Sequence, residues 1–530
     1  MKKILFGAGA LFLCLAFILA SCLEEIDRID KIEDPSFAPS IDFPLVNSDF
    51  SMEEFLTEGE SKARIVDQQG LLVLIYDDTV TTPSAAGFFS LPDQQSPVLS
   101  ITGPEVSFPS PGASVTVTKN LTFAFTPANS EALDSVVIKA GQMLFQMSST
   151  FPANISLDVN ITSLKFQGTA FQRNFTFTGA GSQNPSFNLQ GSSFDLTRNG
   201  TTTNTVSLSI KATITDTGQP INNTHRLDFS FGLDNLGFRA IYGDLGSSST
   251  QLTADSLNVD IFNNTLTSGT FELLDPLIRL TMQNSFGVPL GFDIRNIAVW
   301  RGNTSTALSG AAVNAPNNPY RVSAPSYSQI GQAVTSEINI NASNSNLSQL
   351  ISSFPQYLGY QFDLALNPAP VTSKHFVLDD SKVVVAVHLE LPMHGKVSAL
   401  SISKRFDFSG LGIDDVEQSK IKVKTSNESP LDANVQIFFL DNNGQVLDSL
   451  FAERSFLKGA TVGPDGFTTG AEQVIKEVTV TQAKIDRIEQ AEFLVMTAVM
   501  FTSNNGTVPV KFSTADKLKV SVGVNTRIQY

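Results

Sequence analysis

The chain has 530 residues, enough for three or four domains of ordinary size. Charged residues make up 16% of it, well below the roughly 25% of an average soluble domain. Hydrophobic residues still reach 42%, so the chain can bury a core and is not a disordered, charge-rich polymer. The 35 Lys and Arg against 51 Asp and Glu give a net charge of −16, which argues against nucleic acid as a partner, because that binding depends on neutralising phosphates.

The first 22 residues have the pattern of a targeting segment. Lys2 and Lys3 precede an apolar run of 17 residues from Ile4 to Ala20, which is marginal for a bilayer core about 30 Å thick. The run ends in LASC at residues 19–22. This order resembles the signal peptide and lipobox of Gram-negative bacterial lipoproteins. The resemblance implies removal of residues 1–21, a lipid such as palmitate on Cys22, and an outer-membrane location. A secretory signal with a chance cysteine, or an uncleaved anchor, is the alternative.

Cysteine use agrees with this interpretation. The two cysteines are Cys14, inside the signal, and Cys22, so the mature chain has none left for a disulfide or a thiolate site. Residues 22–40 are rich in Glu and Asp. We expect them to form a solvated tether that the anionic membrane surface repels. They also resemble the export signal that displays some lipoproteins on the outer leaflet; a periplasmic face is the alternative.

From residue 41 onward, the sequence predicts β-structure. Hydrophobic residues alternate with polar ones in runs such as 206–214, 383–391 and 518–530, as expected of strands that bury one face. Turn clusters lie between the runs, for example Asn199-Gly200, residues 441–444, residues 464–466 and Asn505-Gly506. The predicted fold is therefore mainly β, with several antiparallel β-sandwich-like modules and a few short helices.

Three short helices are predicted, at Ser51 to Glu58, Leu347 to Phe354 and Gln482 to Phe493. The first two suggest a repeated unit of strand, Asn/Ser turn and capped helix, at residues 41–51 and 338–348 with an offset of 297. If these are copies of one module, Phe50 and Leu347 are both buried beside their helices, and serines cap them.

A second repeat consists of strand, polar turn, proline and strand. It occurs at residues 280–299 and 421–440, with a weaker copy at 143–161. Proline suits the start of a strand because it cannot donate to the ladder. The segment with Asn284, Gly287 and Pro289 resembles the core of LEA-type (WHy) β-sandwich domains.

These patterns predict a division of the chain into five consecutive segments. They are the signal peptide (1–21), the acidic tether (22–40), a β-rich module with a short N-terminal helix (41–225), a β-sandwich module (226–325), and one or more β-rich modules opening with the repeated strand-turn-helix unit (326–530).

The sequence offers little for catalysis. It lacks the H-E-x-x-H, G-x-S-x-G, P-loop and dinucleotide fingerprints, so we expect neither an enzyme nor a cofactor. Weak metal candidates are His388, Glu390 and His394, near His375. The alternative is that His388 and Glu390 simply face solvent on a strand.

Four triplets of Asp, Ser or Thr, and an aliphatic residue resemble an O-glycosylation motif of some Gram-negative periplasms. Their hydroxyl residues are Thr79, Ser135, Ser256 and Ser449. In function, we expect a lipid-anchored outer-membrane or cell-surface protein with a structural, adhesive or binding role toward an unidentified protein or glycan. The alternative is a carrier that holds an apolar ligand such as a lipid in a Phe-lined cavity.

Overall fold

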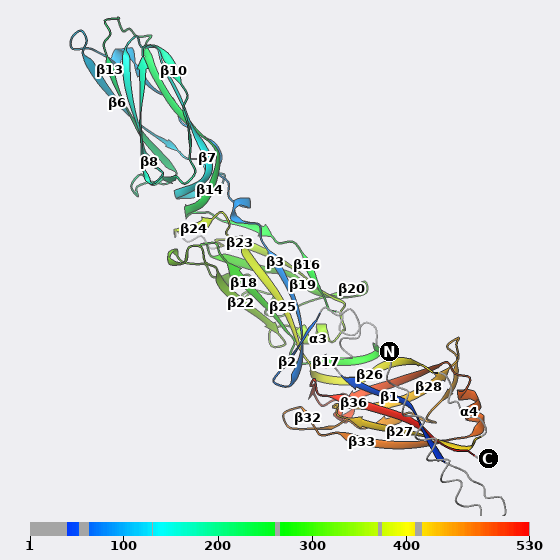
Figure 1. The fold of residues 1–530 in the computed structure, drawn as a ribbon. Coiled ribbons are helices and arrows are strands. Elements are labelled where there is room, and N and C mark those ends of the chain that lie inside the picture. Colours follow the sequence, from blue (N-terminus) through cyan, green and yellow to red (C-terminus); the bar gives the residue numbers. More distant parts are fainter. Residues whose placement is uncertain are drawn as a thin grey trace, which may run out of the picture.

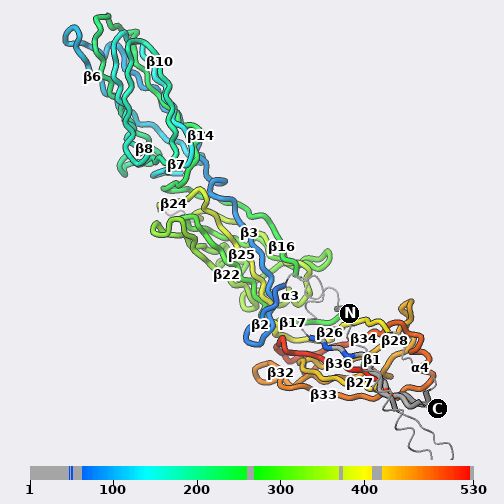
Figure 2. The backbone as a smooth tube through the Cα atoms, in the orientation of Figure 1, coloured from blue at the N-terminus to red at the C-terminus, as the bar shows by residue number. Residues whose placement is uncertain are grey.

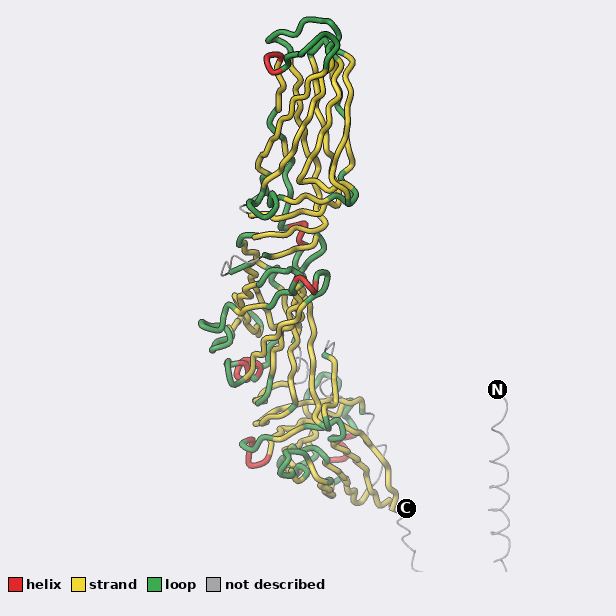
Figure 3. Tube along the Cα trace, turned by 90° about the vertical axis from the view of Figure 1, so that its left-hand side faces the viewer, coloured by secondary structure: helices red, strands yellow, loops and turns green. Residues whose placement is uncertain are grey.

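The computed structural model describes residues 40–51, 63–129, 131–259, 266–368, 374–408 and 416–528. The described chain is mainly β, with antiparallel sheets and a few short helical turns, which confirms the predicted fold class (Figure 3). Three β-sandwich modules follow one another in an elongated row (Figure 1). We call them proximal, middle and distal, the proximal one holding both ends of the described chain.

The proximal module packs a four-stranded sheet on a seven-stranded sheet. The four-stranded sheet has the order β1 (Ser40–Ser51), β36 (Lys517–Ile528), β27 (Val416–Asn427) and β33 (Glu472–Val480). The seven-stranded sheet runs β17 (Leu266–Leu273), β26 (His394–Asp407), β34 (Phe493–Thr502), β28 (Leu431–Leu440) and β29 (Val446–Ser449), with β30 (Ser455–Leu457) beside β28 and β35 (Val510–Lys511) beside β26. A small hairpin of β31 (Thr461–Val462) and β32 (Thr468–Thr469), and the helices α4 (Gln482–Ile488) and α5 (Ser503–Gly506), complete it.

The middle module also has two sheets. The first has the order β2 (Arg64–Gln68), β3 (Leu71–Thr81), β25 (Val383–Pro392), β18 (Leu277–Asn284) and β22 (Val334–Asn341). The second runs β15 (Ser248–Gln251), β23 (Tyr357–Leu366), β19 (Leu290–Arg301) and β20 (Thr304–Ala307), with β16 (Asp255–Asn258) beside β23 and β21 (Tyr320–Val322) beside β19. Its helix is α3 (Leu347–Ile351), and a 3-10 turn, η3, covers Tyr327–Gln329.

The distal module is one sheet folded over a shared core. Its main path is β14 (Arg226–Asp244), β7 (Ala132–Ser149), β12 (Ser193–Asp195), β8 (Asn154–Phe166), β13 (Thr205–Thr215) and β6 (Ser114–Ala124). The shorter strands are β4 (Gln94–Gln95) and β5 (Leu99–Thr102) beside β14, β9 (Thr169–Thr178) beside β8, and β10 (Gly181–Gln183) and β11 (Ser186–Asn188) beside β7. The 3-10 turns η1 (Ala85–Gly87) and η2 (Gly103–Glu105) lie before and after β4 and β5.

The modules are nested in the chain rather than consecutive. The chain contributes β1 to the proximal module and β2 and β3 to the middle one, builds the distal module, and returns through β15 and β16 of the middle module to β17 of the proximal one. It then completes the middle module with β18 to β23 and β25, and ends in the proximal module (Figure 2). The predicted boundaries are therefore wrong. The one at residue 225 falls directly before β14, which pairs with β7 of the same sheet, and the one at 325 separates β18 and β19 from β22 and β23. Local sequence cannot show a pairing between strands hundreds of residues apart.

The junctions between modules are made of backbone bonds and packed side chains. The short strand β24 (His375–Leu378), which precedes β25 of the middle module, pairs with the end of β14 in the distal one. At the other junction, Leu72 N–H donates to the Phe512 carbonyl over 3.0 Å, and Met393 N–H donates to Leu72 over 2.8 Å. One continuous hydrophobic core runs from the distal module to Val510 and Phe512. The row of modules is thus a braced rod.

The second predicted repeat is confirmed in atomic detail. The Asn284 amide donates to the carbonyls of Val288 (3.2 Å) and Ser323 (2.9 Å), and its Oδ1 accepts from Phe286 N–H (2.9 Å). Asn284 is wholly buried, at 0% exposure. We call this arrangement the Asn corner; it turns β18 into β19 and ties both to β21.

Asn427 repeats the same three bonds between β27 and β28. Its amide donates to Leu431 (2.9 Å) and Lys458 (3.0 Å), and its Oδ1 accepts from Ser429 N–H (3.0 Å). The distal module keeps only the third of these bonds, with a serine in place of the asparagine: Ser149 Oγ accepts from Phe151 N–H over 3.2 Å. The strands that follow the corner also have the same order and pairing in the middle and proximal modules, so these two modules share one topology.

The first predicted repeat is wrong. Residues 47–51, expected to be a turn, continue β1 and pair with residues 517–521 of β36. The helix expected after Ser51 and the side chain of Phe50 lie outside the described residues. In the other copy α3 forms and Leu347 is buried, but Ser348 lies inside the helix and donates to the Leu274 carbonyl, while Ser345 Oγ accepts from Leu347 N–H over 3.3 Å.

The true counterpart of α3 is the third predicted helix. Helix α3 joins β22 to β23, and α4 joins the matching strands β33 and β34. Helix α4 ends at Ile488, and Phe493, its expected last residue, begins β34.

Replacing the asparagine of either Asn corner should destabilise the module that contains it. Asn284→Ala leaves three backbone groups without partners, each costing roughly 1–3 kcal/mol, so we expect the middle module to lose about 3 kcal/mol of stability. Asn427→Ala should do the same to the proximal module. Hydrogen exchange should rise in 277–301 for the first variant and in 416–440 for the second. Asn443→Ala, in the exposed β28–β29 turn, is the control and should change neither. Unchanged exchange in both corner variants would contradict the role of the corner.

Candidate functional site: a cavity between the sheets of the proximal module

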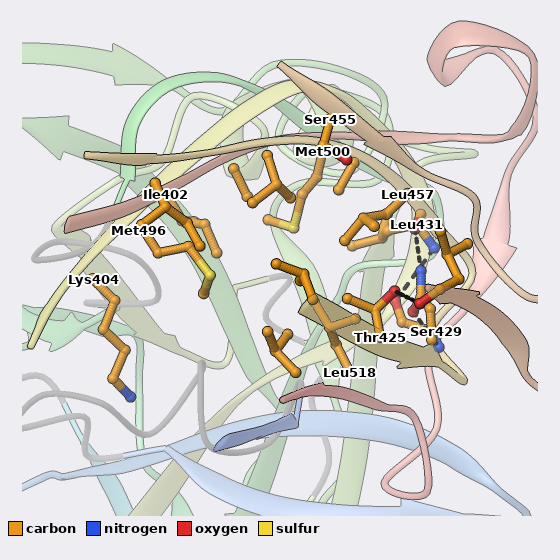
Figure 4. Close-up of a pocket in the computed structure, with 18 of the residues that line it drawn as sticks. Ile402, Lys404, Thr425, Ser429, Leu431, Ser455, Leu457, Met496, Met500 and Leu518 are labelled. Carbon is orange, nitrogen blue, oxygen red and sulfur yellow. Dashed lines mark hydrogen bonds between the residues drawn. The ribbon is translucent and has the colours of Figure 1, made fainter. Parts of the chain in front are cut away.

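A cavity of about 130 Å³ lies between the two sheets of the proximal module. Figure 4 shows Met496, Met500 and Leu457 from the seven-stranded sheet facing Leu518 and Thr425 from the four-stranded one. Methionine side chains adapt to irregular shapes, which suits a wall that must accept a guest. Met496 and Met500 are half-buried even though β34 is an inner strand of its sheet, so the cavity reaches solvent.

Comparison with the middle module shows how the cavity arises. When the two Asn corners are aligned, Val288 corresponds to Leu431. The strand registers then give the corresponding residues on the neighbouring strands of the two modules. Four positions of the cavity wall then have larger counterparts: Ala433, Val435, Ala498 and Met496 correspond to Leu290, Phe292, Leu364 and Phe362. In the middle module these side chains are buried, and the rings of Phe292 and Phe362 lie 4.9 Å apart. Smaller residues at the same positions leave the proximal core open.

The opposite wall carries a charge where the middle module has an apolar residue. In the middle module Leu280 pairs with Ile338 of β22, which is 5% exposed. The matching pair in the proximal module is Val423 and Lys476 of edge strand β33. Lys476 lines the cavity and is half-buried. Within the described residues its ammonium group has neither a hydrogen bond nor an ion pair.

A second lysine, Lys404, also lines the cavity. Three further polar groups there have partners within the protein. Thr425 Oγ1 donates to the Val474 carbonyl (3.3 Å), and Ser429 Oγ accepts from Leu431 N–H (3.3 Å). Asp516 is 4% exposed and accepts from Ser513 N–H (2.8 Å) and Thr468 Oγ1 (3.1 Å). Burial is the main cause that raises the pKa of Asp516 to about 6, and the nearby Glu428 charge adds to it.

The cavity is not lined by phenylalanines, as the alternative function had led us to expect. Phe451 is the one phenylalanine among the residues that line the cavity in the described chain. The phenylalanines instead fill the distal core, where Phe145 is fully buried and packs against five other rings: Phe171, Phe175, Phe187, Phe229 and Phe231. Most of these pairs are edge-to-face, the favoured aromatic geometry. The sequence signal that could have found the cavity is the pair of alanines at inward positions of β28 and β34.

The weak metal candidates do not form one site. His388 Nδ1 pairs with Asp77 (2.5 Å), and Glu390 pairs with Arg279 (3.1 Å) on the outer face of the β3–β25–β18 sheet. His394 pairs with Asp275 (2.6 Å). His375 is buried, which lowers its pKa. No group of three or more His, Cys, Asp or Glu side chains able to hold a metal is found in the described part of the chain.

The four O-glycosylation candidates all lie on strands. Thr79 and Ser256 are exposed, whereas Ser135 and Ser449 are half-buried. The aliphatic third residue is buried in every triplet: Val80, Val136, Leu257 and Leu450. The triplets therefore follow ordinary strand alternation, and glycosylation stays a prediction, best placed at Thr79 and Ser256. Cys22 lies outside the described residues.

A second candidate surface is the tip of the distal module. The end of β14 pairs with β24 next to the middle module, so its start at Arg226 marks the far end. Loops there are braced: Thr150 Oγ1 accepts from Arg226 N–H (2.8 Å), and Asp216 accepts from Gly112 N–H (3.0 Å). The Gly112 bond is the main cause that lowers the pKa of Asp216. Gly103 is required because a Cβ there would lie 1.9 Å from the Asn222 carbonyl oxygen. The tip is a polar surface with a fixed shape.

No family model matches the chain, and no curated protein matches it. Among solved structures, the chain aligns with a "putative secreted protein" from Parabacteroides distasonis ATCC 8503 at 10% identity, covering 92% of this chain and 99% of that one, with a TM-score of 0.28. It aligns with the VP2 subviral particle of infectious bursal disease virus at 9% identity, covering 76% and 74%, with a TM-score of 0.15. None of the helices that the structure describes is long and apolar enough to cross a membrane.

The raised pKa of Asp516 predicts a pH dependence of stability. Because the folded pKa of about 6 exceeds the unfolded value near 4, the folded state binds more protons between these values, and stability falls as the pH rises through this window. Asp516→Asn should remove this decline, gaining about 2 kcal/mol relative to wild type between pH 4 and pH 7. The measurement is the thermal midpoint of the proximal module across this range.

Asp448 is the matched control with the opposite sign. Burial raises its pKa, but the hydrogen bond from Arg487 and further contacts outweigh this and leave the pKa below its usual value. Asp448→Asn should therefore cost stability at pH 7, and the loss should fade as the pH falls toward 3. Parallel pH profiles for wild type and Asp516→Asn would refute the assignment.

Proposed function

We propose that this protein is a lipid-anchored rod that holds its distal module away from the outer membrane, in a structural or adhesive role without catalysis. The observation that carries the proposal is the nested path of the chain. Strands β1 and β36, the first and last of the described chain, pair with each other in the proximal module, and the distal module is at the opposite end of the row (Figure 1). An anchor at Cys22 then attaches to one end of the rod only.

The tether and the junctions support this arrangement. The 17 residues from Leu23 to Pro39 span at most about 60 Å when extended, so the proximal module stays near the membrane. The paired strands and continuous core at both junctions resist bending of the rod. The braced polar loops of the distal tip are then the surface placed farthest from the lipid, for a protein or glycan partner.

The anchor is tested by substitution of its cysteine. Cys22→Ala should block lipidation, leave an unprocessed precursor, and make globomycin treatment without further effect. Cys14→Ala, within the same segment but outside the lipobox, is the control and should be processed like wild type. Gel mobility and partition into detergent give the readout. Normal processing and membrane partition of Cys22→Ala would overturn the anchor.

The orientation is tested with single cysteine labels. The mature chain has no other free thiol once Cys22 is acylated, so Asp49→Cys in β1 and Asn223→Cys at the tip, both exposed, can each carry one fluorophore. In lipid vesicles with a quencher in the bilayer, we expect strong quenching of the Asp49 label and none of the Asn223 label. Equal quenching of both labels would show that the rod lies flat on the membrane.

A further inference from the structure

We propose that the cavity of the proximal module binds the alkyl chain of a medium-chain carboxylic acid, with the carboxylate held by Lys476. The site goes beyond display of the distal tip. It is built from an apolar wall of suitable size and an inward-facing cation of the described chain.

The size of the cavity sets the length of the ligand. Its volume of about 130 Å³ is close to the roughly 150 Å³ of an engineered protein cavity that takes up benzene. Roughly six carbons fit inside, and the half-buried Lys476 lies between this apolar space and solvent. An unbranched acid of about eight carbons therefore places its tail among Met496, Met500 and Ala498 and its carboxylate at the rim.

The charge of the ligand follows from Lys476. This lysine occupies the position of the buried Ile338 in the middle module, so strand parity turns it toward the cavity rather than toward solvent. A half-buried ammonium group gains from a charge-assisted bond to an anion. Asp516, the buried carboxylate at the cavity, is already engaged by Ser513 and Thr468.

An ordinary structural explanation of Lys476 exists. Inward-pointing charged residues on edge strands prevent sheets of neighbouring molecules from pairing. That explanation accounts for a lysine on β33, but it does not account for the four smaller residues on the facing sheet. The loss of core volume and the gain of a cation occur together in one of two modules that share a topology.

The test measures binding by calorimetry to the mature chain, residues 22–530 with Cys22→Ala, which retains every described element. The probes are octanoate, octanol and octylamine at pH 7.5. We expect octanoate to bind at least tenfold more tightly than octanol, and octylamine to bind most weakly. Lys476→Gln should lower octanoate affinity about tenfold and leave octanol unchanged. Lys420→Gln, whose side chain pairs with Glu477 on the neighbouring strand, is the control and should bind like wild type.

Two further variants fill the cavity with the residues of the middle module. Ala498→Leu and Ala433→Leu copy Leu364 and Leu290, and each should lower the affinity for both octanoate and octanol more than tenfold. Thermal midpoints equal to or above that of wild type show that both variants fold.

Four results would overturn the proposal. The first is that the wild-type protein does not bind octanoate, and the second is that it binds octanoate and octanol equally well. The third is that Lys476→Gln binds octanoate as tightly as the wild-type protein does. The fourth is that both filled variants bind as tightly as the wild-type protein. The third assigns Lys476 to edge protection, and the fourth places the ligand elsewhere. None of them affects the anchoring and orientation tests of the rod, which read processing and distance.

Discussion

The pairing of β1 with β36 is the constraint on which the order of the whole chain depends. Ser521 donates to Asn47 across these strands over 2.9 Å, although the two residues are 474 positions apart. Such a contact can form only when the chain between them has become compact, because the entropy of closing a loop must be offset before the contact stabilises anything. The distal module, whose strands are contiguous in sequence apart from β24, forms without that condition. Nesting therefore favours folding from the distal module toward the proximal one.

The same path fixes the mechanical character of the molecule. In a chain of consecutive domains a single linker joins each pair, whereas here the chain crosses each junction more than once. Leu72, on the outgoing strand β3, bonds to Phe512, and Met393, on the returning chain, bonds to Leu72. Repeated crossings, shared backbone hydrogen bonds and a shared core join the modules into a rod. The same path brings the first and last strands of the described chain together in the proximal module.

The sequence predicts the local features of this fold and misses the remote ones. Alternation identifies β13, β25 and β36, and the turn residues at 441–444 and 464–466 lie in hairpins as expected, because these features depend on neighbours a few residues away. The Asn and Pro positions of the second repeat are predicted for a similar reason, since the corner is a five-residue structure plus one distant carbonyl. The first repeat fails because Asn47 and Ser48 are polar residues in a strand, and their resemblance to Asn344 and Ser345 is one of composition. The cavity is missed because two inward alanines have meaning only once their facing residues are known.

The middle and proximal modules share one topology. Features common to both therefore indicate what the fold requires, and features that differ indicate what it tolerates. Both keep the buried asparagine, since removing its amide would leave backbone groups at the strand corner without partners in a place that water does not reach. They differ at the centre of the sandwich, where packed Phe292 and Phe362 correspond to Val435 and Met496. Lost core volume of this kind normally costs several kcal/mol, because a cavity forfeits the contacts of its walls. The proximal module nevertheless keeps the strand order of the middle one, with β1 at the position of β3. The buried asparagine is therefore common to both modules, whereas the residues between the sheets vary enough to leave one of the two modules open.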